Sequence, residues 1–222
     1  MADCTLIFHI RPRLDLRCSE TEKVLSAIAR EFPNSGWVDA SDRTIQGFHS
    51  IQASIDAVKP KDFERFGLTW CAKTTDTQPL VLTVATGGDE FALNSFEIDL
   101  SRRQKIPPLS VFIEIVKTVA PFQAFYYFEN SEELLRQKVR EYGTKRFPVK
   151  SLRCVHFFDV AFANKLGGVQ RLLAIPNARK TEIANGVLIE FTTNLNAHNE
   201  EDIDAQLKAM EFLGMITKQP VN

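Results

Sequence analysis

The chain lacks the residue patterns of the common catalytic and cofactor sites. Its 222 residues contain no G-x-S-x-G, P-loop, G-x-G-x-x-G or H-E-x-x-H motif. No C-x-x-C pair or zinc-knuckle spacing is present among Cys4, Cys18, Cys71 and Cys154. No Glu is followed two positions later by Lys, which argues against the metal site of a restriction-endonuclease-type nuclease. We therefore expect no catalytic residues, no cofactor and no metal, and we expect that the protein is not an enzyme.

Long apolar runs and a strong net charge are also missing. No stretch approaches the ~18 apolar residues that a membrane span requires. The start of the chain places Asp3, His9 and Arg11 where a signal peptide would be basic and then apolar. The formal net charge of −1 creates no overall field that would attract nucleic acid or an anionic membrane. We expect a cytoplasmic protein with reduced cysteines that binds neither nucleic acid nor membrane.

What the chain does contain is an interleaved series of strand and helix patterns. Leu6, Phe8 and Ile10 alternate with more polar positions, as in a half-buried strand. The segments 80–86 and 96–100 flank the turn glycines Gly87 and Gly88, which predicts a hairpin. We predict further strands at 68–73, 124–128, 152–158, 170–175 and 187–191, helices at 19–32, 109–119, 131–142 and 200–213, and a loop at 177–185.

These patterns predict an α+β fold with a mixed, largely antiparallel sheet and helices packed on it. Seventeen Phe against three Tyr and two Trp predict a core rich in plain apolar rings. No linker or repeat interrupts the chain, so we predict one domain over residues 1–222. The alternative is a boundary near residues 101–108, where a basic loop meets Pro107 and Pro108.

The C-terminal segment has the most distinctive pattern. Gly186-Val-Leu-Ile-Glu-Phe-Thr reads as a strand, and an Asn-rich loop follows it. Asn199 is the predicted N-cap of a helix that ends at Gly214, and Ile203, Leu207 and Met210 form its apolar stripe.

This strand, loop and helix, which ends in Phe-Leu-Gly-Met-Ile, resemble the C-terminal signature of the Immunity-protein-52 family over residues 168–216. Those are immunity proteins of bacterial polymorphic and type VI secretion toxins. The chain departs from the family pattern at residues 205–207, where Ala-Asn-x-Ile-Glu is usual. The resemblance implies a cognate toxin effector as partner, with a restriction-endonuclease-type nuclease as the expected toxin. It implies neutralisation of that toxin by stoichiometric protein–protein contact.

Acidic clusters are the candidate partner-binding surface. Acids at helix N-termini stabilise the helix through its dipole, by about 0.3–1 kcal/mol each, without any partner. An acidic ridge can also stand in for phosphates in the basic cleft of a nuclease, and Trp or Tyr can supply anchors. Trp37, Trp70, Tyr126 and Tyr127 are the anchor-type residues. The predicted partner-binding residues are Trp37, Asp39, Asp42, Glu129, Glu132, Glu133, Glu200, Glu201, Asp202, Asp204 and Glu211.

Two other functions stay open from the sequence. Cys154, His156 and Asp159 are the candidates if the protein is an enzyme of another type, although residues two apart on a strand lie about 7 Å from one another. The chain could also be a scaffolding module, and a homodimer is possible. The basic residues Lys145, Arg146, Lys150 and Arg153 surround Phe147, but short basic loops are typical of solvated surface.

Overall fold

The computed structural model describes residues 4–10, 19–31, 34–39, 68–74, 80–85, 94–100, 106–192, 195 and 199–218. Contacts group the chain into two compact units, one mainly of residues Thr5–Pro121 and the other mainly of residues Phe122–Asn222. The division follows Pro121 rather than the 101–108 segment. The prediction of a single domain stays a prediction. Antiparallel strand pairs with helices packed against them confirm the α+β fold class.

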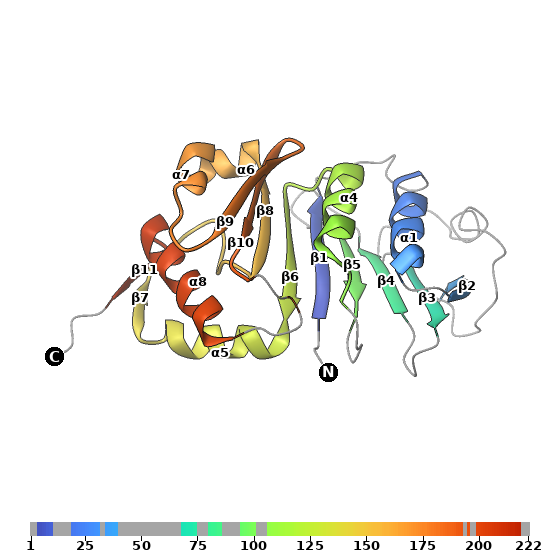
Figure 1. Ribbon diagram of the computed structural model, residues 1–222, viewed down its shortest axis with the longest axis horizontal. Coiled ribbons are helices and arrows are strands. Elements are labelled where there is room, and N and C mark those ends of the chain that lie inside the picture. Colours follow the sequence, from blue (N-terminus) through green and yellow to red (C-terminus); the bar gives the residue numbers. More distant parts are fainter. Residues whose placement is uncertain are drawn as a thin grey trace. The chain divides into compact units, whose positions relative to one another are not determined.

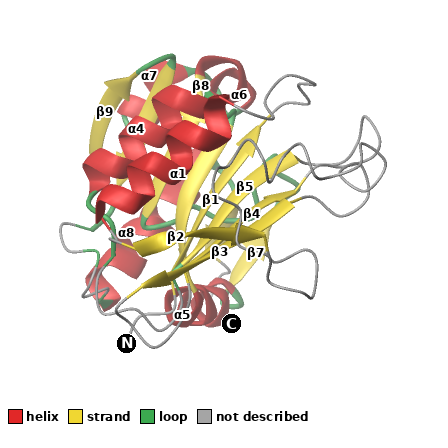
Figure 2. Ribbon diagram, turned by 90° about the vertical axis from the view of Figure 1, so that its right-hand side faces the viewer, coloured by secondary structure: helices red, strands yellow, loops and turns green. Residues whose placement is uncertain are grey.

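The first unit builds one antiparallel sheet in the order β2-β3-β4-β5-β1. Two helices, α1 and α4, lie side by side on one face of it (Figure 2). The predicted pairing of segments 80–86 and 96–100 is confirmed by the pair β4 and β5. The elements are β1 Cys4–Ile10, α1 Ser19–Glu31, β2 Asn34–Asp39, β3 Leu68–Thr74, β4 Leu80–Ala85, β5 Asn94–Asp99 and α4 Leu109–Val119 (Figure 1).

Strand β1 shows why the first unit folds as predicted. Leu6, Phe8 and Ile10 are buried, while Ile7 and His9 between them are only half-buried. The ring of Phe8 lies 5.1 Å from that of Phe112 in α4, so the buried side of the strand faces the helix. The period-two pattern of the sequence therefore selects the face that the helices cover.

The second unit builds an antiparallel sheet in the order β6-β8-β10-β9 and a separate ladder of β7 with β11. Its elements are β6 Gln123–Phe128, α5 Glu129–Val139, β7 Tyr142–Thr144, β8 Val155–Asp159, α6 Val160–Lys165, α7 Val169–Leu173, β9 Arg179–Ile183, β10 Gly186–Glu190, α8 Glu200–Leu213 and β11 Ile216–Lys218 (Figure 1). Among the described helices of both units, none is long and apolar enough to cross a membrane.

The core of the second unit lies between the sheet and α8. Phe158 of β8 and Ile189 of β10 are fully buried there, and the predicted apolar stripe of α8 packs into the same cluster. The ring of Phe158 stacks on that of Phe162 at 5.7 Å, which extends the core toward α6. Phe-rich packing is thus confirmed in this unit, because the side chains at its centre carry no polar atom that needs a partner.

Gly186 is the tightest point of the second unit. A Cβ atom at this position would lie 2.1 Å from the backbone oxygen of Phe158 and 2.7 Å from the ring of Phe157. Close approach of two strands requires a residue without a side chain here. The glycine that begins β10 is therefore required by the close packing between β10 and β8.

Two predictions about this unit are wrong. Residues 170–175 were predicted as a strand, but Val169–Leu173 form the short helix α7 after Gly167 and Gly168, which both have positive φ. Residues 177–185 were predicted as a loop, but Arg179–Ile183 form β9 in a hairpin with β10. The residues of β9 are exposed or half-buried, so its charged composition reflects an edge strand rather than a loop.

Candidate functional site

Helix α8 carries five acidic residues, of which four are exposed. Its buried side holds Ile203, Leu207 and Met210, as the sequence predicts. The opposite side is exposed, and Glu201 and Glu211 form no ion pair with any described residue. The exposed charged residues of α8 are Glu200, Glu201, Asp204, Lys208 and Glu211.

The ends of α8 are firmly fixed. Asn199 accepts from the backbone N–H of Asp202 at 2.9 Å, and the Asp202 carboxylate accepts from the backbone N–H of Asn199, which completes a capping box. The helix ends at Gly214 in the left-handed conformation, with φ +76°. Arg171 of α7 donates to the carbonyl of Leu213 at 3.1 Å, where a cation complements the helix dipole. Asp202 thus has a structural role as well as its charge.

Phe212 adds an apolar side chain to this acidic surface. It is 42% exposed, and it is one of the two large hydrophobic residues, with Val160, that the described surface exposes. It follows Glu201 by about three helical turns, so it lies on the same side of α8. Phe212 is not among the residues predicted from the sequence, although its helical spacing from Glu201 is a signal that could have identified it. We name the surface of Glu200, Glu201, Asp204, Lys208, Glu211 and Phe212, which has four acids and one lysine, the α8 face.

Asp204 links the α8 face to α5. Its carboxylate accepts a hydrogen bond from Nζ of Lys138 at 2.8 Å. This bond, with further attraction from Asp204 and Glu200, raises the pKa of Lys138, while partial burial opposes the shift. The ion pair therefore joins the last turn of α5, rather than its acidic start, to the α8 face.

The acids of α5 are directed inward or along the helix. Glu132 is buried and forms an ion pair with Arg153, whose guanidinium lies 5.4 Å from the ring centroid of Phe125 and 5.2 Å from that of Tyr127. Burial lowers the pKa of Arg153 to about 10, so the group stays charged at neutral pH. Arg153 therefore belongs to the interior and not to the exposed basic cluster that its sequence neighbours form.

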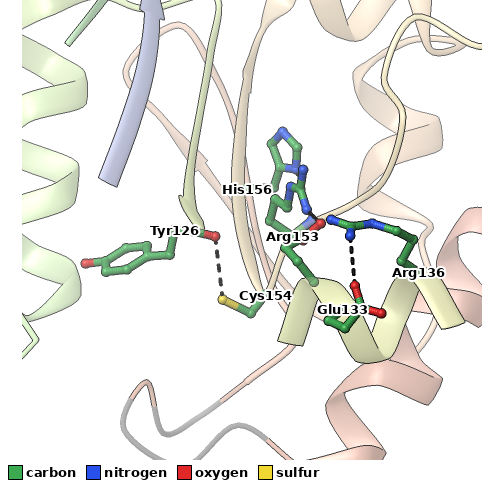
Figure 3. Close-up of polar contacts among 7 residues, drawn as sticks. Tyr126, Glu133, Arg136, Arg153, Cys154 and His156 are labelled. Atoms are coloured by element: carbon green, nitrogen blue, oxygen red, sulfur yellow. Dashed lines mark hydrogen bonds and ion pairs between the residues drawn. The ribbon is translucent and has the colours of Figure 1, made fainter. Parts of the chain in front are cut away.

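The other two acids of α5 are exposed. Glu133 accepts from Arg136 at 2.8 Å and from Gln137 at 3.1 Å, both on the same helix (Figure 3). Glu129 begins the helix two residues before the predicted cap Ser131, and Phe128 is the N-cap without a side-chain bond. Only Glu129 among the α5 acids is exposed without an ion pair to a described residue.

Trp37, Asp39, Asp42 and Trp70 precede Pro121 in the chain, whereas the anchor candidates Tyr126 and Tyr127 lie on β6 of the second unit. Trp37 and Asp39 belong to strand β2, and Asp42 lies outside the described residues. Trp70 lies on β3. Tyr126 is fully buried and is therefore wrong as a binding anchor, and burial raises its pKa well above the usual value.

Cys154 and His156 do not form a nucleophile–base pair. The Cys154 thiol donates to the backbone oxygen of Tyr126 at 4.0 Å, and the ring of His156 points away from it (Figure 3). Burial raises the pKa of the Cys154 thiol, which keeps it protonated and unreactive. Asp159 caps α6 by accepting from the backbone N–H of Phe162 at 2.6 Å.

His156 is held by its neighbours on both ring nitrogens. The backbone N–H of Arg153 donates to Nδ1 at 3.2 Å, and the side-chain amide of Gln123 lies 2.8 Å from Nε2. A neutral imidazole carries one N–H, so the donor and the acceptor in the contact at Nε2 depend on the tautomer of the ring. The ring also stacks on Phe158 at 4.2 Å. In the described part of the chain, no three His, Cys, Asp or Glu side chains gather as a metal would require.

The structure thus defines an α+β protein with an acidic helix face and no nucleophile–base pair at its candidate catalytic residues. It is similar to the solved structure of the Pseudomonas aeruginosa type VI secretion system (T6SS) protein PA0821, with a TM-score of 0.61. The two sequences are 12% identical, and the match covers 98% of this chain and 74% of that one. At this identity the similarity shows a shared fold. No described protein family and no relative with a curated description matches the chain.

Proposed function

We propose that this chain is an immunity protein that neutralises a cognate toxin of a type VI secretion system by stoichiometric contact. The exposed α8 face is the observation that carries the proposal. Two further observations support the proposal: the fold of the chain is similar to that of a T6SS protein, and residues 168–216 resemble the Immunity-protein-52 family. The proposal assigns no catalytic step to this chain.

The chemistry of the α8 face fits a basic toxin cleft. Glu200, Glu201, Asp204 and Glu211 are exposed carboxylates, which place negative charge where a nuclease would bind phosphates. Phe212 lies among them as an apolar anchor, and interfaces draw most of their binding energy from such residues. The resemblance to the Immunity-protein-52 family suggests a restriction-endonuclease-type nuclease as the toxin, and negative charge on the α8 face is compatible with a nuclease cleft.

Co-expression tests the function directly. Cells that express the toxin encoded beside this chain are expected to survive when the chain is present, and the purified proteins are expected to bind one to one. Association should slow steeply as ionic strength rises, because the salt screens the opposite charges. A toxin that still kills at full expression of this chain contradicts the proposal.

A matched pair of triple variants tests the surface. The variant Glu201→Lys/Glu211→Lys/Phe212→Ala should weaken toxin binding at least about a hundredfold, since it removes the anchor and reverses two charges. The control Glu114→Lys/Glu182→Lys/Val160→Ala makes the same charge change and also removes an exposed apolar side chain, but at residues outside α8. Equal loss in both variants, or no loss in the first, would place the interface elsewhere.

A further inference from the structure

A cavity with a basic rim lies where the β7–β11 ladder ends. It has a volume of about 280 Å³ and is lined by residues 144–147, 149–150 and 215–216. The backbone N–H of Lys145 donates to the carbonyl of Met215 at 3.0 Å, so the cavity lies beside the pair Thr144 and Ile216 at one end of the ladder. Val149, Met215 and Ile216 are buried in its wall, and Phe147 is half-buried. We name this site the ladder pocket.

The rim of the ladder pocket carries only positive charge. Lys145, Arg146 and Lys150 are exposed, and no carboxylate in the described part of the chain forms an ion pair with any of them. Three cations near one another repel in the absence of a partner, and an anionic ligand relieves this repulsion. The pocket therefore favours a ligand that combines negative charge with an apolar group.

The adjoining strands narrow the class of ligand. Among the described strands, β7 and β11 pair only with each other, so each keeps one edge without a neighbour. An extended peptide can add to such an edge through its backbone and place a side chain into a nearby pocket. A lipid headgroup or a free phosphate has no backbone to pair with the strand and no need of the apolar wall.

Nucleic acid fits the ladder pocket less well than protein. Single strands bind where several aromatic rings stack on successive bases, and Phe147 is the one aromatic residue that lines this cavity. The fourth basic residue of the sequence cluster, Arg153, is turned into the interior by Glu132. A volume of about 280 Å³ lies just below the range of small-molecule sites, which suits one large side chain.

We propose that the ladder pocket binds an extended acidic segment of a partner protein, whose backbone pairs with the β7–β11 ladder and whose apolar side chain fills the cavity. This surface is separate from the α8 face and opposite to it in charge, so the inference does not depend on the proposed function. It assigns to the chain a second protein-binding site that selects acidic partners.

The test uses the full chain with methyl-labelled Met and Ile and a panel of short peptides. Each peptide has the form acid-acid-Φ-acid-acid, in which Φ is Leu, Ile, Met or Phe and the acids are Asp or Glu. At least one peptide is expected to shift the methyl signals of Met215 and Ile216 and to leave that of the buried Met210 in place. Replacing Φ by Ser should weaken binding about tenfold or more, because the wall is apolar.

Charge-reversal variants test whether the basic rim contributes to peptide binding. Lys145→Glu/Arg146→Glu/Lys150→Glu should weaken binding of the best peptide at least about tenfold. All three side chains are exposed, so the variant is expected to fold, and far-ultraviolet circular dichroism checks this. The control Lys117→Glu/Arg140→Glu/Lys165→Glu makes the same charge change at exposed positions away from the cavity.

The other ligand classes are outcomes of the same experiment. Inorganic phosphate that reproduces the Met215 shift would reduce the site to an anion site and overturn the proposal. So would a single-stranded oligonucleotide or anionic vesicles that displace the best peptide at lower concentration. Failure of every peptide at millimolar concentration, or equal binding by the rim and control variants, would also overturn it.

Discussion

Helices α5 and α8 begin with similar acidic sequences but use them in opposite ways. In α5, Glu132 turns inward to Arg153 and Glu133 is bonded along its own helix. In α8, one acid completes the capping box and the others face outward. A cluster of acids in a sequence is therefore no guide to a binding surface until the partners of each carboxylate are known.

The two helices differ again in the polar side chain that each buries. Glu132 of α5 is 9% exposed and is compensated by the charge of Arg153. Gln206 of α8 is 2% exposed, and its Oε1 has no hydrogen-bond partner among the described residues. One helix thus buries a carboxylate that is balanced by an opposite charge, and the other buries an uncharged acceptor without a hydrogen-bond partner among the described residues.

Removing the carboxylate of Glu132 should have the largest effect. Glu132→Ala leaves the charge of Arg153 buried and unpaired, which is expected to lower the free energy of unfolding by about 3 kcal/mol. The control Glu133→Ala, which removes an exposed acid one position along, should cost well under 1 kcal/mol. Urea unfolding followed by circular dichroism measures both. The double variant Glu132→Met/Arg153→Met should recover most of the loss, and a double variant as unstable as the single one would contradict the pairing.

Replacing the unsatisfied acceptor of Gln206 in α8 should have the next largest effect, and it should stabilise the protein rather than destabilise it. Gln206→Leu replaces an unsatisfied acceptor by an apolar group of similar size and is expected to raise the free energy of unfolding by about 1–2 kcal/mol. The same urea experiment measures it. A loss of stability would show that Oε1 has a partner in the folded protein.

Helix α8 has a side-chain N-cap and α5 has none, and a single substitution removes this difference. Asn199→Ala should cost about 1 kcal/mol, because the backbone N–H of Asp202 loses its acceptor. Amide hydrogen exchange is expected to speed up in the first turn of α8 and to stay unchanged in α5, whose N-cap Phe128 has no side-chain bond to lose. Equal acceleration in both helices would mean that the cap stabilises the whole unit rather than its own helix.

The smallest effect concerns the bond that joins the two helices. Lys138→Ala should cost a few tenths of a kcal/mol, since the partner Asp204 is largely exposed. The pKa of Lys138 is raised above its usual value of 10.5, so the contribution is fully present below that pH and is lost as the pH rises through the folded pKa. Urea unfolding at pH 7 and pH 11.5 should show the gap between the native protein and Lys138→Ala closing, and a gap that widens with pH would contradict the assignment.

Local sequence patterns were enough to predict the helices and strands that have a strong hydrophobic periodicity. The buried sides of β1 and α8, the N-cap Asn199 and the terminus Gly214 all follow from spacing and capping chemistry, and the structure confirms them. The helix α7 was missed because five residues are too few to show a helical period. Strand β9 was missed because an exposed edge strand carries charged residues and resembles a loop.

The candidate sites were harder to predict because they depend on distant pairs. The sequence places Arg153 in a basic cluster, but its ion pair with Glu132, which is distant in sequence, shows that its side chain is directed inward. The ladder pocket joins residues near 145 with residues near 215, which no local pattern connects. Trp37 and Asp39 were predicted from composition alone, and they stay predictions together with Asp42.

The unpaired edges of the β7–β11 ladder carry a risk that the nearby lysines reduce. A bare strand edge in a folded protein is a template for another copy of the same strand, which leads to self-association. Lys145 and Lys218 stand beside the ladder, and two copies brought edge to edge would set like charges against one another. The cations that attract an acidic strand would thus also keep the protein from polymerising through its own edge.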